Sequence, residues 1–145
     1  MNIGKEFRWE MGHRLPFHTR GCQNMHGHSY RLIVEMEGEP GPTGMVADYT
    51  DLKEIVKPLV DRLDHAFMCD ATDAAVCAFL EQNGMKAVNV PFATTAENIA
   101  LYILHHITEA IETARKHTGV WNAVRNVRVR LCETESTYAD CEAAL

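Results

Sequence analysis

The chain has 145 residues, of which 46% are hydrophobic and 23% charged, with a formal net charge of −6. A chain of this length buries roughly 70% of its unfolded surface in one core, so residues 1–145 are predicted to form a single domain. The negative charge argues against binding nucleic acid, and no apolar run is long enough to span a membrane. The charged N-terminus is unlike a signal peptide and the five scattered cysteines fit reduced thiols, so we expect a cytoplasmic protein.

Two strand patterns open the chain. Apolar and charged residues alternate across residues 4–12, which predicts a half-buried strand that ends near His13. The same alternation over residues 26–39 predicts a second strand. Near the C-terminus, residues 126–134 and 137–144 predict two more strands.

The middle of the chain has helical patterns. Apolar residues recur every three or four positions across residues 52–63, and a shorter helix is predicted over residues 72–82. The longest helix is expected to begin at a capping box formed by Thr94 and Glu97 and to end at Gly119. The order strand, strand, helices, strand, strand favours an α+β fold in which helices cover one face of an antiparallel sheet.

The stretch CQNMHGHSY, residues 22–30, predicts a metal site. Alternate residues of a strand project to one face, so His26 and His28 converge, and Gly27 between them leaves room for close backbone approach. His13 could add a third ligand from the preceding strand. Three neutral nitrogens with one open position describe a catalytic zinc site. The alternatives are surface histidines without a metal, or a closed structural site with Cys22 as the fourth ligand.

The surroundings of the cysteines indicate two different roles. Cys22 lies in a polar, glycine-containing loop beside the expected cation, which favours a thiolate that acts as base or nucleophile. Three other cysteines are interpreted as small, buried hydrophobic residues: Cys69, Cys77 and Cys141.

Two further polar groups stand out. His65 follows Asp64 at the end of a predicted helix, where it either interacts with the helix dipole or carries protons while the carboxylate orients it. Glu133 continues the apolar face of a strand, so its carboxylate either lies in water beyond the sheet or binds a planar ligand with adjacent N–H donors, such as an aminopyrimidinone ring.

Six motifs together resemble the 6-pyruvoyltetrahydropterin synthase and 6-carboxytetrahydropterin synthase family. They are FRWEMGHRL, CQNMHGHSY, GMVADYTDLK, LDH, TTAEN and CET, and in this order they span nearly the whole chain. The resemblance implies a tunnelling fold (T-fold), in which a four-stranded antiparallel sheet carries helices on one face. It also implies a homo-oligomer, typically a hexamer, whose sheets join into a barrel with active sites between subunits.

The resemblance assigns roles by position. It implies zinc ligands at His13, His26 and His28, and catalytic roles for Cys22, Asp64 and His65, the last two in some cases acting from a neighbouring subunit. It implies that the pterin ring is bound by Glu133, Thr94 and Thr95. Residues 69–86 lie in an apparent insertion, to which the resemblance gives no role.

The implied activity is a zinc-dependent lyase reaction on 7,8-dihydroneopterin triphosphate. The favoured outcome is 6-carboxy-5,6,7,8-tetrahydropterin, formed with release of acetaldehyde and triphosphate on the route to queuosine. The alternative is the 6-pyruvoyltetrahydropterin synthase reaction, which eliminates triphosphate and retains the side chain. From a different class of protein, a non-catalytic structural zinc or metal-sensing module remains open.

Overall fold

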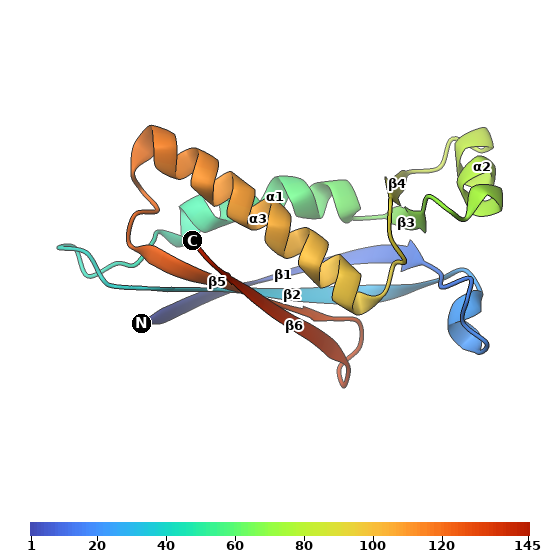
Figure 1. The fold of residues 1–145 in the computed structure, drawn as a ribbon, viewed down its shortest axis with the longest axis horizontal. Helices are drawn as coiled ribbons and strands as arrows, with labels where there is room; N and C mark the ends of the chain where they lie inside the picture. The colour runs from blue at the N-terminus through green and yellow to red at the C-terminus, as the bar shows by residue number, and fades with distance from the viewer.

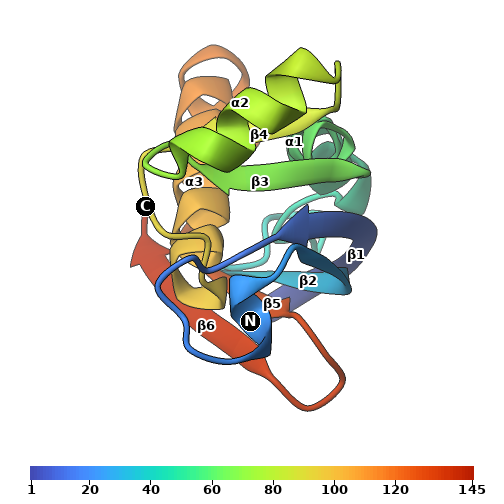
Figure 2. The same ribbon diagram turned by 90° about the vertical axis from the view of Figure 1, so that its right-hand side faces the viewer.

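A curved sheet of six strands runs through the protein (Figures 1 and 2). The structure is a computed structural model that describes residues 1–145, apart from the side chain of Thr118. In chain order the strands are β1 (Asn2–His13), β2 (His26–Gly38), β3 (Ala66–Asp70), β4 (Ala87–Val90), β5 (Val124–Cys132) and β6 (Tyr138–Ala144). Their order across the sheet is β4-β3-β1-β2-β5-β6.

The sheet confirms the α+β class but corrects the expected count of four strands. β1, β2, β5 and β6 pair with antiparallel neighbours, as the alternating patterns predicted. β3 and β4 extend this sheet beyond β1 with parallel pairing. Only Met11 and Gly12 of β1 pair with β3, and this paired segment is too short to produce a periodic pattern in the sequence.

Three α-helices accompany the sheet, namely α1 (Tyr49–Leu63), α2 (Ala74–Gln82) and α3 (Ala96–Thr118). α1 and α3 lie on the same side of the long strands (Figure 1). The cap of α3 is Thr95, whose hydroxyl accepts from the backbone N–H of Asn98, so the expected cap at Thr94 is one residue too early. Gly119 ends α3 in the left-handed conformation, as expected. Within the described residues, no helix has the length and apolar character needed to cross a membrane.

The main core lies between the sheet and the two long helices. Alternate residues of β2 face these helices and are buried, among them Tyr30, Leu32 and Met36. Ile99 and Ile103 of α3 are buried with them. Burying a large apolar side chain contributes roughly 2 kcal/mol relative to exposing it, so this layer holds β2 in register with its neighbours.

The segment from β3 to β4 packs as a small unit at one end of the sheet (Figure 2). α2 contacts both β3 and β4, and a separate apolar cluster joins α2 to β3. Its buried members are Cys69, Val76 and Leu80, with Phe67 and Cys77 packed against them. The apparent insertion, residues 69–86, therefore lies within an ordered strand-helix-strand unit beside the end of β1.

Candidate active site

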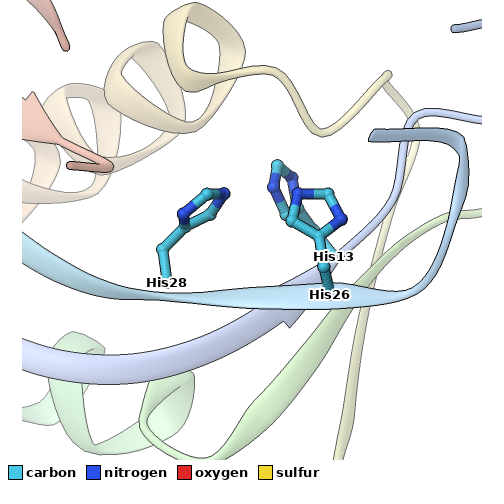
Figure 3. A group of neighbouring side chains, drawn as sticks. All are labelled: His13, His26 and His28. Atoms are coloured by element: carbon cyan, nitrogen blue, oxygen red, sulfur yellow. The ribbon is translucent and has the colours of Figure 1, made fainter. Parts of the chain in front are cut away.

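Strand register brings three histidines together at the loop end of β1 and β2. His13 pairs directly with His26, and His28 is two residues further along β2 on the same face. One nitrogen from each ring lies within 4.8 Å of the others (Figure 3). A Cβ on Gly27 would lie 3.2 Å from the carbonyl oxygen of Met11, so a glycine suits this close pairing of the strands.

Backbone carbonyls orient two of these rings. Nδ1 of His13 lies 2.7 Å from the carbonyl oxygen of Thr94, and Nδ1 of His26 lies 2.8 Å from that of Asn24. A carbonyl can only accept, so each Nδ1 carries the proton and each Nε2 keeps a free lone pair. Both Nε2 atoms are buried and have no hydrogen-bond partner among the described residues. This outer hydrogen bonding is typical of histidines that bind a metal.

Burial favours the neutral, metal-binding form of His13 and His28. It is the main cause that lowers the pKa of His13, and the neighbouring rings of His26 and His28 lower it further. Burial also lowers the pKa of His28. Neutral imidazoles with inward lone pairs suit zinc, for which histidine nitrogen is a common ligand. The three residues therefore fit a zinc ion.

These pKa shifts predict that the metal-free protein loses stability as the pH falls below about 6.5. In the unfolded chain both histidines return to their ordinary pKa of 6.5, whereas in the folded protein their pKa is lower. The unfolded chain then binds more protons, so the free energy of unfolding falls between pH 6.5 and the folded pKa. Thermal unfolding in a chelator, measured across this pH range, checks the slope.

His13→Asn should flatten this pH dependence, because it removes the more buried of the two histidines whose pKa is lowered. His105→Asn is the matched control: His105 lies on α3 with a side chain that is 67% exposed, and its replacement should leave the slope unchanged. An unchanged slope in His13→Asn would contradict the assignment.

A carboxylate lies beside the histidines. Oε1 of Glu133, just beyond β5, is 3.8 Å from Nε2 of His13 and accepts a 3.3 Å hydrogen bond from the hydroxyl of Tyr30. Tyr30 is fully buried, which raises its pKa, and its ring stacks on Trp9 at 5.4 Å. Tyr30 therefore stays protonated and donates to Glu133. No motif in the sequence had given Tyr30 a role in the site.

Asp64 and His65 lie in contact just beyond the end of α1. Oδ1 of Asp64 accepts from the backbone N–H of Glu10 and lies 3.0 Å from Nδ1 of His65. The hydrogen bond from Glu10 and the one from His65 hold the pKa of Asp64 below its ordinary value. His65 has a φ of 57° and a side chain that is 76% exposed. A cavity of about 520 Å³ is lined by both His65 and His28.

The other residues expected in the site, Cys22, Thr94 and Thr95, lie in three different local environments. Cys22 is half-buried in a short 3-10 turn, Gly21–Gln23, and its carbonyl accepts from the N–H of Leu15 at 2.7 Å. Among the described residues, the group able to hold a metal consists of the three histidines and does not include Cys22. Thr94 is buried, and its hydroxyl donates to the carbonyl of Arg14, while Thr95 caps α3.

A sheet that brings three histidine nitrogens together beside a carboxylate is typical of a metal-dependent enzyme for a small molecule. Comparison with known proteins identifies the family. The family described as 6-pyruvoyl tetrahydropterin synthase matches residues 2–144. The chain therefore belongs to the 6-pyruvoyl tetrahydropterin synthase family, and it is an enzyme of the lyase class.

Relatives and solved structures agree with this family. A 6-carboxy-5,6,7,8-tetrahydropterin synthase of Haemophilus influenzae is 39% identical over 82% of this chain and 90% of its own. One from Aquifex aeolicus is 30% identical over 95% of both chains. The solved 6-pyruvoyl tetrahydropterin synthase of Plasmodium falciparum is 18% identical, has a TM-score of 0.77, and covers 100% of this chain and 98% of its own. The fold is therefore the T-fold.

Proposed function

We propose that this chain converts 7,8-dihydroneopterin triphosphate to 6-carboxy-5,6,7,8-tetrahydropterin, with release of acetaldehyde and triphosphate. The observation that carries the proposal is the histidine triad beside Glu133, in a chain whose relatives are named 6-carboxy-5,6,7,8-tetrahydropterin synthases. The histidines provide a place for a metal, and the carboxylate provides a place for a pterin.

His13, His26 and His28 would hold the zinc ion. When bound, zinc supplies a Lewis acid that lowers the pKa of protons on the hydroxyl-bearing side chain of the substrate. The protein contributes the geometry: the carbonyl groups of Thr94 and Asn24 fix the rings of His13 and His26 before any metal arrives.

Glu133 would hold the pterin ring. A carboxylate accepts two parallel hydrogen bonds from adjacent N–H groups, and the aminopyrimidinone edge of a pterin carries such a pair. The hydroxyl of Tyr30 holds one oxygen of Glu133 in place, and the 3.8 Å separation from His13 puts the anchor next to the metal ligands. We propose that Thr94 and Thr95 contact the same ring.

Cys22 and His65 would move protons. The Cys22 thiolate acts as general base toward the three-carbon side chain of the substrate, and His65 acts as its acid-base partner. Asp64 orients the His65 ring through the 3.0 Å contact at Nδ1. The high exposure of His65 supports a role in a site shared with a neighbouring subunit.

We further propose that residues 1–145 act as a single domain in a cytoplasmic homohexamer that serves queuosine biosynthesis. Among the described residues, no strand pairs with residues 2–10 of β1 on the side away from β2. On that side, Glu10 contacts Asp64 and His65 through its backbone. Joining such edges between subunits would satisfy their backbone groups and protect the sheet from aggregation.

The pyruvoyl-forming reaction is the second candidate, favoured by the description of the matching family. A closed zinc module, which needs a fourth protein ligand, has less support because Cys22 does not join the histidines in the described part of the chain.

Anaerobic incubation of the zinc-loaded protein with dihydroneopterin triphosphate tests the proposal. Mass analysis of the pterin should show the carboxytetrahydropterin, and an enzymatic assay should detect an equal amount of acetaldehyde. Pyruvoyltetrahydropterin without acetaldehyde would select the second candidate. Absence of turnover by the zinc-loaded protein would contradict both reactions and favour the module.

A further inference from the structure

Two cysteines outside the active site lie in contact. Cys69 is at the end of β3 and Cys77 is in the first turns of α2, and their sulfur atoms are 2.8 Å apart. This separation is within about 1 Å of the S–S bond length in a disulfide, ~2.05 Å. Both cysteines are free thiols, so the segment holds a reduced pair that could bond with a small movement.

The surrounding loop fixes the pair in place. Both sulfur atoms lie near the carbonyl oxygen of Asp70, at 3.5 and 3.4 Å. The loop between them is closed by a hydrogen bond from the N–H of Asp73 to that same carbonyl and by two from Thr72 to the Asp70 carboxylate. The hydrogen bonds of this turn therefore hold the two thiols close together.

We propose that Cys69 and Cys77 form a redox-active dithiol, a modification site that low-molecular-weight disulfides of the glutathione type oxidise reversibly to an intramolecular disulfide. This pair is separate from the histidine triad and from Cys22. The inference does not depend on which pterin product the enzyme forms.

The exchange takes place in two balanced steps. The Cys77 thiolate attacks one sulfur of the small disulfide, forms a mixed disulfide and releases one thiolate of the reagent. Cys69 then loses its proton to solvent, and its sulfur attacks the Cys77 sulfur, which forms the internal bond and expels the second thiolate. The pair loses two electrons, and the small disulfide gains them as it becomes two thiols.

The two cysteines differ in a way that sets this order. Cys77 is half-buried, whereas only 2% of Cys69 is exposed, so the small disulfide reaches Cys77 first. Burial, and then the neighbouring Cys77, raise the pKa of the Cys69 thiol to about 12. Cys69 therefore suits the role of resolving cysteine, because the Cys77 sulfur that it attacks already lies beside it.

The bond would tighten the wall of the cavity that His65 lines. Phe67 and Leu80 belong to the apolar cluster around the two cysteines, and both also line this cavity. Asp73, between the two cysteines, forms a bidentate ion pair with Arg14, the residue that follows His13. Oxidation would thus hold α2 against β3 beside the end of β1.

Peptide mass analysis tests the proposal directly. The zinc-loaded protein is equilibrated with glutathione buffers of graded redox potential, quenched in acid, alkylated and digested with trypsin. Arg62 and Lys86 bound a peptide that contains both cysteines. The oxidised peptide should have lost two hydrogen atoms and carry no alkyl groups, so that three of the five thiols remain titratable.

A second cleavage of this peptide, on the N-terminal side of Asp70 and Asp73, distinguishes the disulfide from other modifications. The fragment with Cys69 and the fragment with Cys77 stay joined only if the two cysteines are linked. Cys77→Ser should abolish the cross-link, while Cys141→Ser, at a half-buried thiol on β6, should retain it. Hydrogen exchange of the wild-type protein should be slower across residues 70–82 after oxidation. Glutathione on Cys22 alone, or alkylation of both cysteines at every potential, would overturn the proposal.

Discussion

Replacement of Cys22 by alanine is expected to leave zinc bound and to abolish turnover. Among the described residues, the group able to hold a metal consists of three histidines, and it does not include Cys22. Backbone carbonyls hold two of the three rings. Loss of a general base lowers kcat by about 10²- to 10⁴-fold. Zinc content by atomic absorption and product formation by chromatography measure the two effects separately.

Cys141→Ala is the control for this experiment. Cys141 is also half-buried, but it lies on β6, where it pairs with Val129 of β5, and it should keep both zinc and activity. Zinc loss together with unfolding in Cys22→Ala would favour a structural module. Full turnover in that variant would remove Cys22 from the reaction and leave His65 as the remaining candidate base.

The sequence predicted the strands in which apolar and polar residues alternate. Residues 26–39 alternate because one face of β2 packs against helices while the other faces solvent, and this pattern depends on local positions alone. β3 has the burial pattern of a short strand covered on both sides, without regular alternation. Its parallel pairing with β1 joins segments more than fifty residues apart, so no local signal reveals it.

The site was predictable only in part for a similar reason. The spacing of His26 and His28 on one strand is a local feature, and it placed both on one face. The direct pairing of His13 with His26, by contrast, depends on the register between two strands. The Thr94 carbonyl reaches His13 from the start of a distant helix, and Cys77 meets Cys69 across a turn, so tertiary packing alone reveals both contacts.

The sequence around the start of α3 does not decide which of two threonines caps the helix. Thr94 and Thr95 are adjacent and chemically alike, and either could cap the helix. Packing decides between them, because the hydroxyl of Thr94 donates to the Arg14 carbonyl and its own carbonyl accepts from His13. Thr94 is thereby held at the end of β1, and Thr95 becomes the cap.

Glu133→Gln is expected to weaken pterin binding by about 10- to 100-fold, because hydrogen bonds to a charged group contribute about 1.5–3 kcal/mol. Glutamine has the same shape and can still accept from Tyr30, so the fold should be preserved. Its amide nitrogen, however, offers a donor where a pterin N–H needs an acceptor. Calorimetric titration with dihydroneopterin measures the affinity, and zinc content shows whether the metal is retained.

Glu135→Gln provides the matched control, since Glu135 is exposed in the same turn. This variant should bind pterin as the wild type does. Equal affinity in Glu133→Gln and wild type would contradict the anchoring role, whereas weaker binding accompanied by zinc loss would place Glu133 in support of His13 instead. Both readouts are needed, because Oε1 of Glu133 lies 3.8 Å from Nε2 of His13, close enough for the carboxylate to affect this histidine as well as a bound pterin.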